Sequence, residues 1–420
     1  MGQKKWWLHM AACGVLALNL AVFGVGCGNS EDSAVADADR QETTEQIEDT
    51  LEQGTEVELN ASKSTETYIE LGTEESENTE ALLETETEWE ITGAYDFTLC
   101  FGGDISLDEN AVTTAQLDAS EGDISKCISP ELLAIMQEAD FMCLNNEFTF
   151  SNNGSPMNGK AYTFRANPER VSVLQDMGVD LVQLSNNHVY DYGKQALLDT
   201  FDTLEGAGID YFGAGRNLEQ AMSPVYYTID DKVVAFVGAS RAEKNKMTPQ
   251  ATEEKPGILR CYDTELFLQA IAEADANADF VIAVVHWGTE YSYKLEDVQL
   301  TTGKEYLDAG ADAIIGGHSH CLQGMEFYDG KPIIYSLGNY WFNNKTLDTM
   351  LIELHFSGND EEKNLEVRMI PAIQTNAMTI WVDEAEQQRI YDFMESISIN
   401  VEIDENGIVK EKATVKSSNR

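Results

Sequence analysis

The sequence predicts a large α/β domain over residues 93–420, preceded by an export segment and an acidic tether. From Asp96 onward, short apolar runs with strand character alternate with stretches of helical periodicity. Between about residue 28 and residue 92 the chain is instead rich in Glu, Thr and Ser. With 43 % hydrophobic residues in 420, the chain can build a sizeable core.

The charge balance excludes two classes of partner. The chain carries 27 Lys and Arg against 74 Asp and Glu, a formal net charge of −47. Residues 93–420 alone hold 53 acids and 23 bases, so the expected folded domain is acidic too. A nucleic-acid binder needs clustered basic residues, and adsorption to anionic lipid needs a polybasic patch. We therefore expect neither.

The N-terminus has the pattern of a secretory signal. Two lysines at positions 4 and 5 precede an apolar run over residues 6–26. That run is just long enough to span a bilayer, so an uncleaved anchor is the alternative, which Asn19 weakens. Cys27 follows Gly26 as in a bacterial lipobox, although Gly24 stands where a Leu is usual. We expect residues 1–27 to be a lipoprotein signal peptide and lipidated Cys27 to hold the chain at the outer face of the cell membrane.

Residues 28–92 are expected to be a disordered acidic linker. Between residues 31 and 92 there are 21 acids and two bases. Such a composition buries too little apolar surface to offset the entropy lost on ordering, and like charges extend the chain. The linker would hold the domain away from the membrane.

The main domain shows a regular succession of elements. Strands are predicted at 97–101, 141–144, 181–184, 233–237, 281–285, 311–315 and 333–337, and helices at 168–177 and 193–207. After residue 345 the pattern predicts strands at 350–356 and 365–369, an amphipathic helix at 383–397 and a hairpin around 404–407. The odd number of widely spaced cysteines in this domain is no disulfide framework, and Cys100 and Cys143 are expected to be buried thiols.

Polar residues that can bind metal follow five of these strands. Ligand sites in α/β sheets form at the carboxyl ends of strands, so these side chains should converge. They are Asp104, Glu147, Asn187, His286, His318 and His320. The chain has only six histidines. Four of them lie in strand-end turns: His188, His286, His318 and His320. Mixed nitrogen and oxygen donors suit one or two divalent ions of Mn, Zn or Fe.

Four segments of residues 96–345 resemble the CapA (PGA_cap) family, the poly-γ-glutamate capsule synthesis proteins of the calcineurin-like metallophosphatase superfamily. They are Asn186-Asn187-His188-Val-Tyr-Asp191-Tyr-Gly193, His286-Trp287-Gly288-Thr-Glu290-Tyr291, Gly317-His318-Ser-His320 and Ser336-Leu-Gly338-Asn339. The resemblance implies two packed mixed β-sheets flanked by helices, a four-layer metallophosphatase-like sandwich. Residues 346–420 would complete that domain.

The resemblance also implies a ligand set. One ion would be held by Asp104, Glu147 and His320. The other would be held by Glu147, Asn187, His286 and His318, so that Glu147 bridges. The superfamily's first motif is Asp-x-His, whereas here Asp104-Ile-Ser106 lacks the histidine, and Glu147 stands where an Asp is usual. These departures remove an imidazole from the first site. A centre with one tightly and one loosely bound ion therefore fits the sequence as well as a centre with two tightly bound ions.

Three further residues take roles by the same resemblance. His188 would sit at the substrate and donate a proton or hydrogen bond, and Asp191 would orient it. Arg165 would contact an anion.

Three aromatic residues beside the motifs, Trp287, Tyr340 and Trp341, are expected to pack beneath the site. Tyr291 is left between packing and a substrate wall, Glu290 between supporting a ligand and lying at the surface, and the polar segment 242–256 between a cover and a plain surface loop.

Two kinds of function follow. Two divalent ions can activate a water molecule and stabilise both the attacking and the leaving oxygen of a displacement reaction. This predicts a hydrolase that acts on phosphoesters or, less favoured, on amides. The alternative is a non-catalytic factor that binds or guides poly-γ-glutamate, or another envelope polymer, beside a membrane synthase. A γ-glutamyl amide hydrolase lies between the two. The acidic domain repels a polyanion unless metal or local arginines such as Arg165, Arg216 and Arg241 offset the charge.

Overall fold

The computed structural model describes residues 93–244, 246–359 and 361–413. The predicted signal peptide, the acidic linker and Cys27 lie outside these residues. No helix within the described ranges has the length and apolarity needed to cross a bilayer. The five cysteines that are described are all free and buried, as expected.

One large sheet runs in the order β19-β20-β17-β16-β1-β2-β5-β6, with β15 also paired to β1 and β18 to β17. Its strands are β1 (Tyr95–Ile105), β2 (Phe141–Asn146), β5 (Leu181–Gln183), β6 (Asp210–Phe212), β15 (Asn339–Trp341), β16 (Leu347–Gly358), β17 (Lys363–Thr375), β18 (Met378–Trp381), β19 (Val401–Ile403) and β20 (Ile408–Glu411). Strands β1, β2, β5 and β6 are parallel, whereas β16 and β17 return antiparallel.

The second sheet has the order β13-β14-β12-β11-β9-β8. Its strands are β8 (Val225–Ile229), β9 (Lys232–Ser240), β11 (Phe280–His286), β12 (Ala313–Gly317), β13 (Leu322–Tyr328) and β14 (Lys331–Leu337). Strands β9, β11, β12 and β14 are parallel. Two short pairs complete the strands: β3 (Thr149–Phe150) with β4 (Arg165–Ala166), and β7 (Ala214–Gly215) with β10 (Gly257–Ile258).

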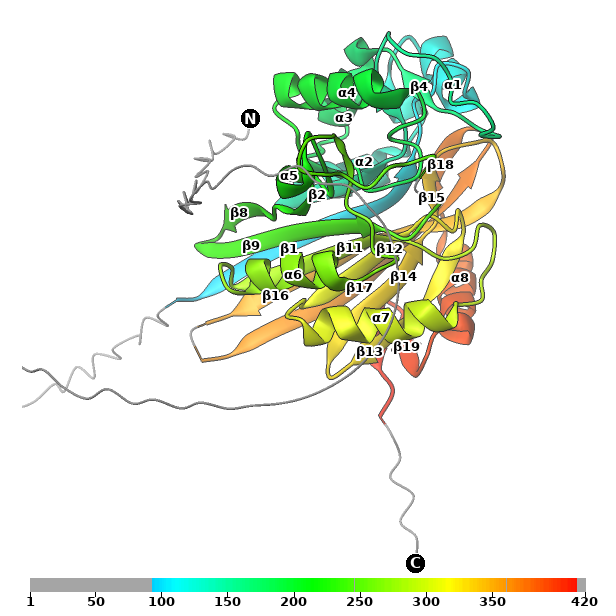
Figure 1. The fold of residues 1–420 in the computed structure, drawn as a ribbon. Helices are drawn as coiled ribbons and strands as arrows, with labels where there is room; N and C mark the ends of the chain where they lie inside the picture. The colour runs from blue at the N-terminus through cyan, green and yellow to red at the C-terminus, as the bar shows by residue number, and fades with distance from the viewer. Residues whose placement is uncertain (1–92, 245, 360, 414–420) are drawn as a thin grey trace, which may run out of the picture. The chain divides into compact units, whose positions relative to one another are not determined.

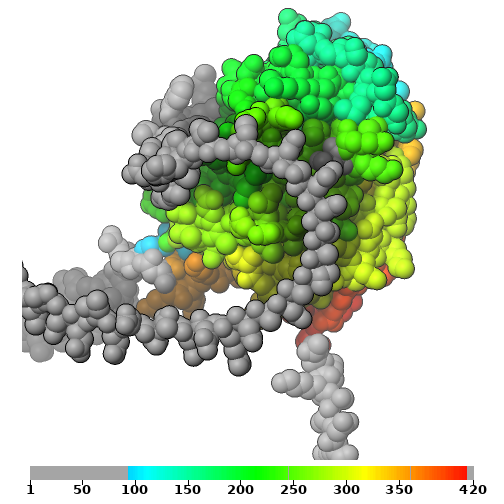
Figure 2. Space-filling model, in the orientation of Figure 1, coloured from blue at the N-terminus to red at the C-terminus, as the bar shows by residue number. Residues whose placement is uncertain are grey.

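The helices are α1 (Val112–Ala119), η1 (Ile124–Lys126), α2 (Pro130–Glu138), η2 (Pro168–Arg170), α3 (Val171–Asp176), α4 (Gly193–Ala207), α5 (Leu218–Met222), α6 (Glu265–Asp275), α7 (Asp297–Asp308) and α8 (Glu384–Ile397). All except α8 cover the outer faces of the two sheets (Figure 1). Helices α1–α4 pack on the larger sheet and α5–α7 on the smaller one. In Figure 2, α3 and α4 form the upper part of the visible surface, and α6 and α7 the lower part.

Three apolar cores match this layering. The one between the sheets joins Phe101 of β1 with Phe236 of β9 and Ile282 of β11, and α8 contributes Ile390 and Met394 to it. The other two lie between each sheet and its helices. Alternate residues of β1 therefore belong to different cores, because successive side chains of a strand point to opposite faces. The predicted two packed mixed sheets flanked by helices are confirmed.

The local predictions differ from the structure at a few points. Helix α4 has the predicted bounds, but the helix expected at 168–177 is split into η2 and α3. Strand β1 continues through Ile105 rather than ending before Gly102. A glycine is required at position 103 inside this strand, because a Cβ there would lie 2.0 Å from the carbonyl oxygen of Gly338.

Candidate metal centre

The predicted ligands converge where the parallel strands of both sheets end. Asp104 lies at the end of β1, where it pairs in register with Asn145 of β2 and Asn339 of β15. His286 is the last residue of β11 and pairs with Gly317 of β12, which places His318 beside it. Glu147 directly follows β2. All six predicted ligands are at most 7 % exposed, so this is an interior polar cluster.

The first group consists of Asp104, Glu147 and His320, each of which offers a ligand atom within 4.8 Å of the others. Nδ1 of His320 lies 3.4 Å from Oδ2 of Asp104, and its Nε2 lies 3.8 Å from Oε1 of Glu147. Oδ1 of Asn339 lies 2.7 Å from Nδ1 of His320 and orients the ring. The two carboxylates and the imidazole thus direct their donor atoms toward a common point.

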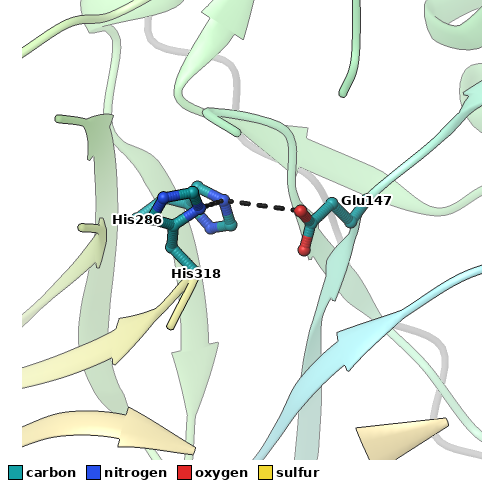
Figure 3. Close-up of side chains that lie close together, drawn as sticks. All are labelled: Glu147, His286 and His318. Carbon is teal, nitrogen blue, oxygen red and sulfur yellow. Dashed lines mark hydrogen bonds and ion pairs between the residues drawn. The ribbon is translucent and has the colours of Figure 1, made fainter. Parts of the chain in front are cut away.

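The second group consists of Glu147, His286 and His318 (Figure 3). Nε2 of His286 lies 3.7 Å from Oε1 of Glu147 and 3.1 Å from Nδ1 of His318. Oδ1 of Asn187 approaches the same Nε2 to 2.8 Å. Glu147 belongs to both groups, so its carboxylate stands between them.

The polar atoms left without partners fit a cation. Oδ2 of Asp104 and Oε1 of Glu147 are buried and accept no hydrogen bond from any described residue. Burying a carboxylate oxygen without compensation is costly, and a divalent ion would compensate both oxygens at once. Carboxylate, amide and imidazole donors together suit Mn, Zn or Fe.

The electrostatics agree with that fit. Burial, reinforced by the nearby charge of Asp104, raises the pKa of Glu147 well above its usual range. Burial and the neighbouring imidazoles lower the pKa of His286 far below normal and that of His318 to about 3. Burial also opposes the charged form of His320, but the neighbouring carboxylate of Asp104 and the contact with Asn339 raise its pKa. His286 and His318 are thus neutral, the form that binds metal.

His188 and Asp191 lie in contact with one another beside the cluster. Nδ1 of His188 is 2.7 Å from Oδ2 of Asp191, and its Nε2 is 3.8 Å from Oε1 of Glu147. The same Asp191 oxygen accepts a 2.7 Å hydrogen bond from the backbone N–H of Phe164. The carboxylate therefore holds the ring with Nε2 turned to the cluster.

Sequence reasoning missed Asn145, which lies at the middle of the cluster. Its Nδ2 donates to Oδ1 of Asp104 at 2.7 Å and to Oε2 of Glu147 at 3.2 Å. Its Oδ1 in turn accepts a 3.0 Å hydrogen bond from Nδ2 of Asn186. Asn145 thus fixes the two carboxylates with their other oxygens free. Its position in the polar run just before Glu147 was a signal that could have indicated it.

Lys160 is a second residue that sequence reasoning missed. Its side chain is 6 % exposed, and its Nζ pairs with Asp191 and, at 2.9 Å, with Glu243. The same ammonium donates to the backbone carbonyl of Asn187. It therefore ties a ligand turn, the carboxylate behind His188 and a third loop together. A single Lys in a Gly- and Asn-rich loop carries no pattern that predicts this.

The segment 242–256 packs against the centre rather than forming a plain surface loop. Glu243 pairs with Lys160, and the hydroxyl of buried Thr248 donates to the carbonyl of Asn187 at 2.9 Å. Arg260 holds the segment by donating to the carbonyls of Glu243 and Thr248. The segment thus supports a predicted ligand from behind.

The guanidinium of Arg165 is not part of the cluster. It pairs with Glu109 at 2.8 Å and lies 4.4 Å from the centre of the Tyr192 ring. Among the described residues its guanidinium contacts no predicted ligand, because Glu109, on the loop after β1, takes its charge. The structure therefore gives no support to the anion contact predicted for Arg165.

The aromatic residues beside the motifs divide into a buried set and one exposed ring. Trp287, Tyr340 and Trp341 are fully buried, and the two indole N–H groups donate to backbone carbonyls. Tyr291 is instead 43 % exposed, with its ring 5.7 Å from that of His320. His318, His320 and Tyr291 all have positive φ, at 87°, 54° and 56°. Such strained backbone is held only where surrounding structure enforces it, and it is common at functional sites.

The comparisons with known proteins point to one family. The family model described as "Bacterial capsule synthesis protein PGA_cap" matches residues 98–344. "PGA biosynthesis protein CapA" of Bacillus subtilis (strain 168) is 32 % identical over 262 residues, which cover 61 % of this chain and 68 % of that protein. "Capsule biosynthesis protein CapA" of Bacillus anthracis is 35 % identical over 201 residues, covering 46 % of this chain and 48 % of that protein. The chain thus spans about two thirds of the first relative and about half of the second.

Solved structures resemble the chain only distantly. The NAD nucleotidase of Haemophilus influenzae has a TM-score of 0.38 at 10 % identity, covering 73 % of this chain and 64 % of that one. A hypothetical protein from Thermus thermophilus has a TM-score of 0.39 at 15 % identity, covering 66 % and 98 %. At such TM-scores the likeness says nothing about the activity of this chain. The family match, in contrast, extends over more than half of the sequence, from strand β1 to the segment after β15. The chain therefore belongs to the bacterial capsule synthesis protein family PGA_cap.

Proposed function

We propose that this chain is a metal-dependent hydrolase of the phosphoesterase type that serves poly-γ-glutamate capsule biosynthesis at the cell surface. The position of Glu147 carries the proposal. Its carboxylate belongs to both groups of convergent donors, and its Oε1 is buried without a hydrogen-bond partner among the described residues. Family membership supports the link to the capsule polymer.

The residues of the cluster would divide the work between holding ions and holding the substrate. Asp104, Glu147 and His320 would hold one ion, and Glu147, Asn187, His286 and His318 the other. Bound divalent ions would supply polarisation of a phosphoryl or carbonyl oxygen and a reactive water near neutral pH. Asn145 keeps the two carboxylates in place through its amide.

His188 is the group placed to exchange a proton with the substrate. Because Nδ1 faces Asp191, Nε2 is the ring nitrogen that faces the cluster, 3.8 Å from Oε1 of Glu147. There it would donate a hydrogen bond or proton to an anionic or leaving oxygen. The ring of Phe164 lies 4.3 Å from that of His188, and Phe342 lies 4.7 Å from His320. These two rings restrict water and hold the imidazoles in place.

The proposal includes anchoring by lipidated Cys27 and a position at the outer face of the membrane. The sequence pattern of residues 1–27 and the acidic linker support it. Partners would then be the capsule polymer and a membrane synthase complex. The names of the two Bacillus relatives agree with a role in capsule biosynthesis.

A non-catalytic role in polymer assembly is the second candidate. The relatives' names, which refer to biosynthesis rather than hydrolysis, favour it. In that case the metal would shape a binding surface for the polymer. A γ-glutamyl amide hydrolase that trims or releases polymer would share the chemistry of the first candidate and the ligand of the second.

Metal analysis with an activity screen tests the proposal. The full chain, purified without chelator, should contain one to two Mn, Zn or Fe ions by mass spectrometry, and His318→Ala should reduce that content. His355→Ala is the matched control, because His355 pairs with Asp96 far along β16 from the cluster. Hydrolysis of a phosphoester or γ-glutamyl substrate that Glu147→Gln abolishes would support the hydrolase. Absence of metal after Mn²⁺ loading would refute it. Bound metal without turnover, with polymer export lost in Glu147→Gln cells, would favour the assembly role.

A further inference from the structure

An exposed cation and an exposed aromatic ring lie together beside His320. We propose that Lys345 and Tyr291 form a subsite that binds a second anionic group of the substrate, a carboxylate or phosphate remote from the reacting bond. The inference rests on the proposed function in that the metal cluster is taken as the reacting centre.

Tyr291 is fixed next to the cluster by its backbone. Its N–H donates to the carbonyl of Ser319 at 2.6 Å, between the two histidines of the Gly317–His320 turn. This bond and the positive φ of 56° leave the ring 5.7 Å from His320 and 43 % exposed. Tyr291 is therefore an exposed ring beside His320 rather than a core residue.

Lys345 lies over that ring. Its Nζ is 3.6 Å from the ring centre, a close cation–π contact. The backbone around it is held by the buried Gln374, whose Nε2 donates to the carbonyl of Lys345 and whose Oε1 accepts from the N–H of Phe342. The ammonium thus sits on a rigid platform, with its N–H donors open to solvent.

No described carboxylate forms an ion pair with Lys345. The domain has 53 acids for 23 bases in residues 93–420, so partners are abundant. Glu290 directly precedes Tyr291 in the chain, and its negative charge raises the pKa of both Glu147 and His320. An approaching anion must overcome this negative potential, and a free cation at the entrance offsets it locally.

The chemistry points to a substrate with more than one negative group. The metal cluster would take the reacting group, and Lys345 a neighbouring one. An anionic chain such as γ-linked glutamate, with a carboxylate on each unit, has that character. A small monoanionic ester does not need the subsite.

The test measures binding, so that it does not depend on turnover. The full chain, loaded with Mn²⁺, is titrated calorimetrically with a γ-linked glutamate tetramer and with the same tetramer carrying neutral carboxamides in place of its α-carboxylates. The variants are Lys345→Glu, Lys345→Met and the control Lys363→Glu. Lys363 also lies over an aromatic ring, 4.9 Å from the centre of Phe280, but it pairs with Gly358 at the opposite end of the sheet.

Lys345→Glu should weaken binding of the charged tetramer about tenfold and Lys345→Met about threefold, in a salt-dependent way. Lys363→Glu should bind like the wild type, and none of the variants should change binding of the neutral tetramer. Equal affinities of Lys345→Glu and Lys363→Glu for the charged tetramer would overturn the subsite, as would a wild-type chain that does not bind it. A chain that hydrolyses no substrate but shows the Lys345 dependence would refute the hydrolase and retain the subsite.

Discussion

The two ends of strands β1 and β11 bury opposite kinds of side chain. At their beginnings, Phe97 and Phe280 pack against each other and against Phe356 of β16, with ring centres 4.5 to 6.1 Å apart. At their ends, Asp104 and His286 face a polar cluster whose carboxylates include two oxygens that no described residue contacts by a hydrogen bond. One end gains from burial, because apolar area leaves water. The other is costly to bury until something binds there. The same two strands thus separate stability from function.

The largest effect should come from the polar end. Glu147→Gln keeps the shape of the side chain but removes the charge shared by both donor groups. Loss of several kcal/mol of transition-state stabilisation corresponds to a fall in hydrolysis on the order of 10³ or more. Steady-state kinetics and metal content would measure it. The metal-free variant should unfold no more easily than the metal-free wild type, because an uncompensated buried carboxylate is removed. A clearly less stable metal-free variant would contradict the comparison.

The apolar end should respond in the opposite way. Phe97→Ala removes a fully buried ring and should lower the free energy of unfolding by about 3–5 kcal/mol. Denaturant titration would measure this loss. The metal content of the folded fraction should stay that of the wild type. Loss of metal in chains that are still folded would show that the two ends are coupled.

Lys160 joins the two kinds of effect at the polar end. Lys160→Ala would leave the buried carboxylate of Asp191 and the partly exposed Glu243 without their cation, and an unpaired buried carboxylate typically costs about 3 kcal/mol or more. Hydrolysis should fall about 10- to 100-fold, because His188 and Asn187 lose support. Lys160→Arg should restore part of both. If Arg restores stability but no activity, the ammonium has a role at the substrate that a positioning residue would not have.

Chelation should have the smallest effect. It removes the contribution of bound metal at the polar end of the strands and leaves the packing at their apolar end unchanged. A ligand at about 100 times its dissociation constant stabilises a fold by about 2.7 kcal/mol. EDTA should therefore lower the Tm of the wild type and leave that of Glu147→Gln much less changed. Differential scanning calorimetry with and without Mn²⁺ checks this. An equal drop in both proteins would mean that Glu147 does not hold the stabilising ion.

The convergence of Asp104, Glu147, His286, His318 and His320 was predictable because each follows an apolar run that could only be a buried strand. Parallel strands bring their carboxyl ends to one edge, so residues far apart in the chain are placed together by a local rule. The anion contact expected for Arg165 followed from the family resemblance instead, and in the folded chain its guanidinium pairs with Glu109.

By itself, the sequence determined the alternation of strands and helices, the polar residues that end the strands and the family motifs. These depend on periodicity and on neighbours along the chain. Only the tertiary structure decided that Asn145 holds two carboxylates, that Lys160 joins three loops and that Lys345 lies over the ring of Tyr291. Such roles depend on which charges meet across loops, and loop contacts follow from packing that no periodic pattern records.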